Sequence, residues 1–373
     1  MRLIKIILVL MLLMGCYHKS DEVMKNEGIV SFVAVGDNIM HQKLIDLAKR
    51  EDTYDFRPYY QHIKPYIEDA DLSFINQETI IGGRNFGYSG YPLFNTPDEM
   101  IDALYETGFD IVNGSNNHFY DKGKEGVLHS IHQFQKYASM QYIGLYQSEE
   151  EKDQIPVMNK NGIRISFLSY NQYVNYMQET PTHLYNPFDK EQMKNDVNNA
   201  KKISDIVVVS CHWGNENETE ENSFQKEYAQ YLADLGVDVI IGTHTHTLQS
   251  VEWLTGKNGN QTLVAYSLGN FISGMLEEEA QLGAMLSCDF VKVNDKVEVK
   301  NVSVIPLVNH YETSDVQHIM ETRSGFGVYA FKDYTENLAS HHGLNGYHGI
   351  KISKERMIER VYQRVDSSIH IDM

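Results

Sequence analysis

The stretch VDVIIGTHTH, residues 237–246, joins an apolar, β-branched run to two closely spaced histidines. Such a run is typical of a buried strand, and Gly242 marks its end. His244 and His246 are two positions apart, so in an extended segment both side chains point to the same side. That placement favours metal coordination, with an exposed polar loop as the alternative.

Four further polar blocks occur along the chain, most of them directly after an apolar run. They are Gly36-Asp37-Asn38, Asn76-Gln77-Glu78, Asn116-Asn117-His118 with Asp121, and His212-Trp213-Gly214-Asn215-Glu216. Side chains that follow neighbouring strands can converge at one edge of a sheet. Carboxylates and imidazoles suit zinc, manganese or iron. The pattern therefore predicts a centre for one or two divalent ions, which would activate water for hydrolysis.

Each of these residues also has a plainer interpretation. Asp37 is a candidate N-cap for the helix that follows it. Glu78 could be a solvated loop acid. A lone histidine such as His212 is usually structural, but its place after a β-branched run favours coordination. Asn117 offers an amide ligand beside His118, a candidate general acid.

Strand and helix periodicities alternate along the chain. Strands are predicted at 30–35, 72–75, 110–113, 206–209, 237–241 and 262–266, with hairpins over 155–168 and 284–304. Helices are predicted at 41–50, 97–107, 126–138, 189–203 and 223–235. This alternation indicates an α/β sandwich of mixed sheets. From residue 311 onward the sequence is polar, and it fits either a packed extension or a loosely held tail.

Composition narrows the classes of partner. The chain has 373 residues and a formal net charge of −19, so its field repels nucleic acid and anionic lipid headgroups. Three cysteines do not describe a disulfide scaffold. Cys211 neighbours His212 and could be a ligand or a nucleophile, but a small buried core residue is the stronger interpretation.

The N-terminus is typical of a targeting segment. Arg2 and Lys5 precede an apolar run over 6–14, which is too short to span a bilayer. The run ends in Leu13-Met14-Gly15-Cys16, which resembles a bacterial lipobox. We expect a lipoprotein signal peptide over 1–16, a lipidated Cys16, and a flexible tether over 17–28. The protein would then be a cell-membrane lipoprotein on the extracytoplasmic face; a plain signal peptide or an uncleaved anchor are the alternatives.

The polar blocks together resemble those of the calcineurin-like metallophosphoesterase superfamily, and more closely those of the bacterial capsule-synthesis CapA family of poly-γ-glutamate biosynthesis. The resemblance covers roughly residues 29–275 and includes Ser267-Leu268-Gly269-Asn270-Phe271. It implies a four-layer αββα sandwich with a metal centre at one edge. We therefore expect a CapA-like domain over 29–310 and a C-terminal extension over 311–373.

The resemblance also implies roles for individual residues. One metal would be held by Asp37, Glu78 and His246, and the other by Glu78, Asn117, His212 and His244. His118 would be the general acid, oriented by Asp121.

Two departures from the superfamily pattern stand out. Ile39 occupies the usual histidine position, with His41 the nearest histidine, and Glu78 replaces a bridging aspartate.

The resemblance implies a metal-dependent hydrolase or transferase that acts on an anionic cell-surface polymer such as poly-γ-glutamate. Its partners would be that polymer and the capsule-synthesis membrane proteins. Two alternatives remain open: a non-catalytic assembly or export scaffold of the capsule machinery, and a surface phosphoesterase.

Overall fold

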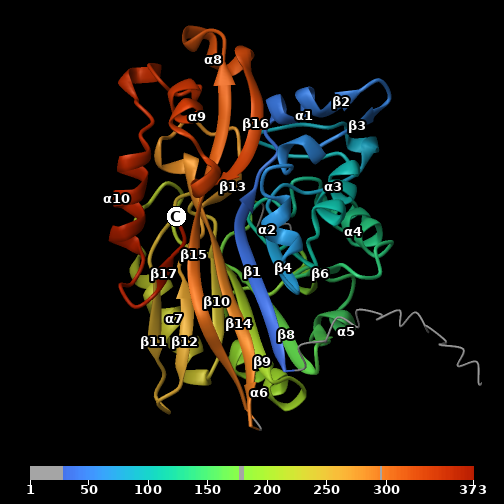
Figure 1. The fold of residues 1–373 in the computed structure, drawn as a ribbon. Helices are drawn as coiled ribbons and strands as arrows, with labels where there is room; N and C mark the ends of the chain where they lie inside the picture. Colours follow the sequence, from blue (N-terminus) through green and yellow to red (C-terminus); the bar gives the residue numbers. More distant parts are fainter. Residues whose placement is uncertain (1–27, 176–179, 295) are drawn as a thin grey trace, which may run out of the picture.

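Two β-sheets face each other in a computed structural model that describes residues 28–175, 180–294 and 296–373 (Figure 1). The expected signal peptide over 1–16, and residues 17–27 of the expected tether, lie outside the described residues. Gly28 is joined to the sheets through backbone hydrogen bonds with Asn161 and Lys292. The described chain therefore begins at the edge of the folded body.

The first sheet has nine strands. In spatial order its main path is β16 (Arg323–Ala330), β15 (Lys296–Thr313), β14 (Leu282–Val293), β1 (Ile29–Asn38), β4 (Leu72–Gln77), β5 (Ile111–Asn113) and β6 (Gln141–Ile143). Two short strands pair beside this path, β13 (Asn270–Ile272) with β1 and β17 (His370–Ile371) with β15. Strands β1, β4, β5 and β6 are parallel, whereas β14, β15 and β16 are antiparallel.

The second sheet has six strands. Their order is β11 (Val251–Thr255), β12 (Gln261–Ala265), β10 (Val239–Thr243), β9 (Ile206–His212), β8 (Ile163–Asn171) and β7 (Val157–Lys160). The four central strands are parallel, and the two edge strands are antiparallel. A separate ribbon pairs β2 (Lys49–Arg50) with β3 (Thr53–Tyr54). The predicted mixed sheets are confirmed.

Helices cover the outer faces of both sheets (Figure 1). Beside the first sheet lie α1 (Gln42–Ala48), α2 (Lys64–Glu68), α3 (Glu99–Thr107) and α4 (Gly123–Phe134), and against the second lie α6 (Lys190–Ile203) and α7 (Ser223–Leu235). The remaining helices are α5 (Glu149–Lys152), α8 (Ile319–Thr322), α9 (Glu336–His341) and α10 (Lys354–Arg364). The predicted αββα layering is confirmed. Helix α7 has the predicted bounds, because Asn222 and Gln225 form a capping box and Gly236 ends it in a left-handed conformation.

The β9 strand shows why its sequence is apolar at successive positions. Ile206 and Val208 belong to the core between the sheets, while Val207 and Val209 pack in the cluster beneath α6 and α7. A parallel strand that is covered on both faces needs apolar side chains in both directions. The sheets meet directly at this core, where the rings of Phe32 and Phe167 are 6.3 Å apart.

The polar blocks lie at, or shortly after, the C-terminal ends of β1, β4, β5, β9 and β10. Close packing of the β1 end explains Gly36, because a Cβ atom there would lie 1.9 Å from the carbonyl oxygen of Gly269. The register between β1 and β4 shifts between Ala34 and Asp37. Asp37 remains paired with Asn76 of β4 and Asn270 of β13 beyond this irregularity.

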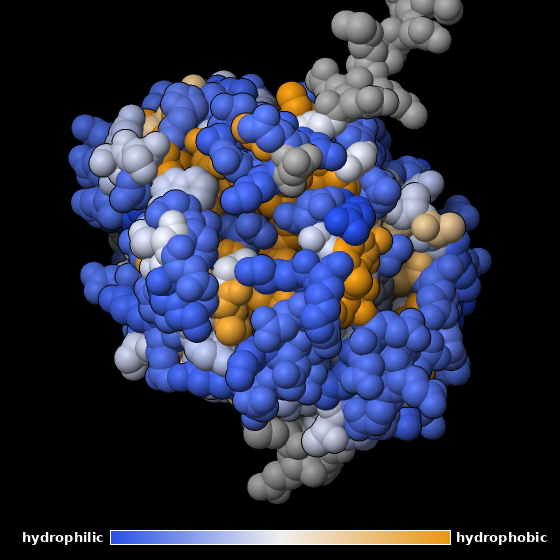
Figure 2. All heavy atoms as spheres, turned by 90° about the horizontal axis from the view of Figure 1, so that it is seen from below, coloured by the Kyte–Doolittle hydropathy of each residue, from blue (hydrophilic) through white to orange (hydrophobic). Residues whose placement is uncertain are grey.

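The opposite end of the sandwich has a different surface. The β14–β15 hairpin lies at the lower end in Figure 1, and Figure 2 shows this end from below. The rim is hydrophilic, and apolar side chains are visible in a hollow at its centre. Among the described residues, no helix has both the length and the apolar character needed to cross a bilayer.

The segment after residue 310 is packed against the body. Strand β15 continues to Thr313, and β16 pairs with it in the same sheet. Val328, Tyr334 and Leu344 of this segment are fully buried in the main core. The sequence left open a packed extension or a loosely held tail, and the structure shows a packed extension.

We expect a chain that ends at residue 310 to lose cooperative thermal unfolding, because the truncation removes β16 and the buried side chains of the extension. Circular dichroism at 222 nm during heating would measure this. Replacement of the exposed Met320 by Ala is the matched control, and it should melt like the wild type. A truncated chain that melts within a few degrees of the full chain would contradict the expectation.

Candidate metal centre

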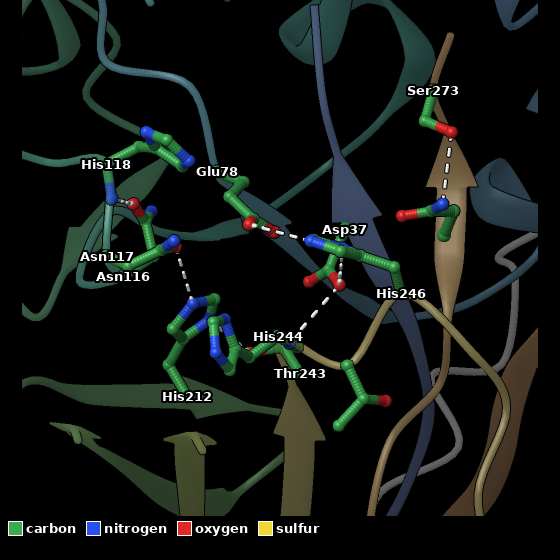
Figure 3. Close-up of polar contacts among 12 residues, drawn as sticks. Asp37, Glu78, Asn116, Asn117, His118, His212, Thr243, His244, His246 and Ser273 are labelled. Carbon is green, nitrogen blue, oxygen red and sulfur yellow. Dashed lines mark hydrogen bonds and ion pairs between the residues drawn. The ribbon is translucent and has the colours of Figure 1, made fainter. Parts of the chain in front are cut away.

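Six predicted ligands come together at one edge of the two sheets, and all six are buried (Figure 3). They come from β1, from the loops after β4 and β5, from the end of β9 and from the segment after β10: Asp37, Glu78, Asn117, His212, His244 and His246. Residues as far apart in sequence as 37 and 246 therefore share one small volume.

The side chains form two groups of three, and in each group the side chains are close enough together to bind one metal ion. Glu78, His212 and His244 make one group, and Asp37, Glu78 and His246 make the other; in each, one ligand atom per residue lies within 4.8 Å of the others. Glu78 belongs to both groups. A carboxylate shared in this way is how two neighbouring divalent ions are bridged.

Asn117 lies beside the first group. Its Oδ1 is 3.1 Å from Nε2 of His212, and Nδ1 of His212 is 2.9 Å from Oγ1 of Thr243. Thr243 faces His212 across the β9–β10 register. The amide oxygen is thus placed next to the imidazole, as the family resemblance implies.

Asp37 is held by three donors. Its carboxylate accepts hydrogen bonds from Nδ2 of Asn76 at 2.8 Å and from the backbone N–H of His244 at 3.2 Å. Nδ1 of His246 lies 3.2 Å away. The competing N-cap interpretation is wrong, because the N-cap of α1 is His41 and no side chain caps that helix.

The geometric reason given for the two histidines is also wrong. Strand β10 ends at Thr243, and His244 and His246 have φ angles of 97° and 62° rather than extended values. Their side chains therefore enter different ligand groups, with ring centroids 6.1 Å apart. Residues other than glycine adopt positive φ at a cost of about 1–3 kcal/mol, and such strain is common at functional sites.

Burial keeps the imidazoles of His212 and His244 in the form that binds metal. Burial, followed by the neighbouring His244, moves the pKa of His212 well below its usual value. Burial and then His246 lower the pKa of His244 to about 3. Neutral imidazole nitrogens are metal ligands, whereas imidazolium is not.

Buried polar atoms without a hydrogen-bond partner show whether a cation would fit this site. Among the described residues, Glu78 Oε1 and His244 Nδ1 are buried without a hydrogen bond. Burial, and then the negative charge of Asp37, raise the pKa of Glu78 well above its usual value. Two crowded carboxylates, with an unpartnered oxygen on Glu78, favour a bound cation, and the donor set suits zinc, manganese or iron. The residues therefore fit one or two divalent ions.

A cavity of about 390 Å³ opens over the two groups. Its lining includes the ligands Glu78 and His246, the acids Glu216 and Glu277, and the rim residue Tyr91. Among the described residues that line it, none is a lysine or an arginine.

His118 lies on the cavity wall and is fixed by an acid. Its Nδ1 is 2.8 Å from Oδ2 of Asp121, which also accepts from the backbone N–H of Phe94 at 2.8 Å. The Phe94 ring makes an edge-to-face contact with the His118 ring at 4.7 Å. Histidine and acid therefore have the predicted pairing, with Nε2 left for the cavity.

Several neighbours were not found from the sequence. Asn76 at the end of β4 holds Asp37, and the backbone N–H of Phe94 holds Asp121. Asn76 was quoted in a polar block but given no role, and an aromatic residue in a loop carries no distinctive signal. Ile39 and His41 both line the cavity, yet His41 lies outside both ligand groups. Cys211 is buried in the cluster beneath α6 and α7, so its core interpretation is confirmed.

The number of metal ions bound by single-residue variants should distinguish the two ligand groups. We expect Asp37→Ala and His212→Ala each to lose one divalent ion, and Glu78→Ala to lose both, because Glu78 belongs to both groups. Elemental analysis after manganese loading, with His129→Ala on the partly exposed face of α4 as the control, would measure this. Loss of a single ion in Glu78→Ala would contradict the shared carboxylate.

Comparison with known proteins gives two relatives. The chain is 28% identical over 254 residues to the PGA biosynthesis protein CapA of Bacillus subtilis, covering 66% of this chain and 64% of that protein. It is 29% identical over 254 residues to the capsule biosynthesis protein CapA of Bacillus anthracis, covering 65% and 59%. The chain thus spans less than two thirds of either relative's length.

Solved structures resemble the chain more weakly. The calcineurin-like phosphoesterase YfkN of Bacillus subtilis has a TM-score of 0.44 and 13% identity, covering 90% of this chain and 99% of that one. A hypothetical protein of Thermus thermophilus has a TM-score of 0.43 and 16% identity, covering 74% and 97%. Similarity of this degree says nothing about activity.

The family comparison is decisive. The model of the bacterial capsule synthesis protein family PGA_cap matches residues 31–275, which hold all six ligands and the His118–Asp121 pair. That match covers more than half of the sequence. The chain belongs to the bacterial capsule synthesis protein family PGA_cap.

Proposed function

We propose that this protein acts in the biosynthesis or processing of an anionic capsular polymer, poly-γ-glutamate or one like it, as a metal-dependent hydrolase or transferase. The relatives named for capsule and PGA biosynthesis support the process. One observation supports the chemistry above all others: Glu78 is shared by two buried ligand groups at the floor of a cavity.

Asp37, Glu78 and His246 would hold one ion, and Glu78, Asn117, His212 and His244 the other. Divalent ions bound there supply positive charge for an anionic substrate and lower the pKa of water. The acidic cavity wall offers no cationic side chain among its described lining residues, so that charge is needed. The chain's own groups fix the position of the reacting bond.

His118 would move the proton. The Asp121 carboxylate accepts the hydrogen bond from Nδ1–H, so the exchangeable position is Nε2, on the cavity side. The same carboxylate stabilises the imidazolium, the form that donates a proton to a leaving group. The Phe94 ring keeps the imidazole in place and shields one side of it from water.

The proposed setting is the outer face of the cell membrane. Lipidation at Cys16 would anchor the chain, and residues 17–28 would link the anchor to β1. In that position the protein would work beside capsule-synthesis membrane proteins and their polymer.

The general-acid role predicts a large loss of turnover in His118→Gln. We expect hydrolysis of poly-γ-glutamate or capsule output to fall about 10²–10⁴-fold, the range for general acid catalysis, while the metal content stays unchanged. Size-exclusion analysis of the polymer would measure this, with exposed His132→Gln as the matched control. A non-catalytic scaffold instead predicts normal output from both His118→Gln and Glu78→Ala.

The anchor predicts a change of fractionation. We expect Cys16→Ser to move from the membrane fraction to the soluble fraction, because the acyl chains are then missing. Immunoblots of fractionated cells would show it, with the buried Cys288→Ser as the control. Unchanged membrane retention would contradict lipidation at Cys16.

A further inference from the structure

His41 lines the metal cavity but belongs to neither ligand group. It follows β1 and caps α1 without a side-chain hydrogen bond to that helix. Its Nδ1 instead accepts a hydrogen bond from the backbone N–H of Gly274 at 3.1 Å. The ring is partly exposed to the cavity. Its role is therefore distinct from metal coordination.

The contact with Gly274 fixes the tautomer of the ring. A backbone N–H can only donate, so Nδ1 must be the bare nitrogen and the proton must be on Nε2. Burial, and then the charge of Arg323, lower the pKa of His41 to about 3, so the ring stays neutral. Among the described residues, Nε2 has no hydrogen-bond partner. An N–H donor is thus held at the cavity wall without a partner.

Arg323 contacts the same glycine through its carbonyl. It comes from β16 in the C-terminal extension, and its Nη1 donates to the carbonyl of Gly274. Its guanidinium packs over the rings of Tyr311 and Phe326, at 5.5 and 5.8 Å from their centroids. Gly274 permits this close arrangement, because a Cβ atom there would lie 2.9 Å from Cβ of His41.

The burial of Arg323 costs folding free energy. Only 2% of the residue is exposed, and among the described residues no carboxylate pairs with it. A buried charge without an ionic partner is destabilising, and its desolvation lowers the pKa of Arg323. Arg323 therefore holds the Gly274 carbonyl at a cost in folding stability.

Two imidazoles flank one aromatic ring at the cavity. Phe94 contacts His41 at 5.5 Å and His118 at 4.7 Å, both edge to face. No lysine or arginine is among the described lining residues, so few N–H donors can reach a substrate anion there. His41, which lines the cavity and carries a proton on Nε2, offers one such donor.

We propose that His41 is a substrate-binding residue whose Nε2–H donates to an anionic oxygen of the substrate, and that Arg323 positions it through the backbone of Gly274. This inference rests on the proposed function, because it assigns a role at the same cavity. The anionic oxygen belongs to a phosphoryl group or to a carboxylate. The C-terminal extension thereby becomes part of the substrate site.

The binding role is tested with the manganese-loaded full chain in detergent. Isothermal titration with inorganic phosphate in one arm and acetate in the other identifies the preferred anion. We expect His41→Phe to weaken the preferred anion about tenfold, the effect of losing one hydrogen bond to a charged group, with the metal count unchanged. His41→Gln should recover part of the affinity, and His132→Phe should match the wild type.

The positioning role of Arg323 is tested by measuring the tautomer of His41. We expect nitrogen-15 NMR to show the Nε2–H form of His41 in the wild type and in Arg323→Lys, and a mixture of tautomers in Arg323→Met. An Nδ1–H wild type would overturn the proposal, as would an unchanged tautomer in folded Arg323→Met. If Arg323→Met does not fold, the wild-type spectrum and the His41 variants decide.

The two proposals fail separately. A wild type that binds no divalent ion contradicts the proposed function. A wild type that binds ions, but whose affinity for both anions is the same in His41→Phe, contradicts only the role of His41.

Discussion

Two buried carboxylates, Asp37 and Glu78, lie close together where the two sheets meet, and their repulsion must be offset by a positive charge. Burial and Asp37 raise the pKa of Glu78, and Glu78 Oε1 has no hydrogen-bond partner among the described residues. Three buried imidazoles complete the ligand groups, and burial lowers the pKa of His212 and His244. The strained backbone at His244 and His246 is the cost of bringing these groups together.

The rest of the architecture serves this arrangement. The central strands are covered on both faces and close-packed, so the positions at which the ligand loops begin are rigidly fixed. The C-terminal extension adds β16 to the first sheet, and Arg323 on that strand reaches the Gly274 peptide at the cavity. The extension thus completes the sheet and also contacts the wall of the cavity.

The sequence predicted what depends on local pattern. The β-branched run at 206–209 and the glycine-terminated helix at 223–235 both appear where expected, because periodicity and capping decide them. The candidate ligands were found from polar blocks after apolar runs, but their division into two groups came from the family resemblance, since the partners are up to 209 residues apart. The conformation of His244 was mispredicted, because positive φ is imposed by the surrounding fold. Arg323 carried no signal, since its side chain reaches a backbone carbonyl 49 residues away, and any residue type offers such a carbonyl.

The central claim is that two cations share the carboxylate of Glu78. Anomalous diffraction from crystals soaked in manganese, collected on both sides of the manganese absorption edge, tests it most directly. The account predicts two anomalous peaks, one beside Asp37 and His246 and the other beside His212 and His244, with Glu78 between them. Peaks confined to surface acids, with none in this buried cluster, would contradict it.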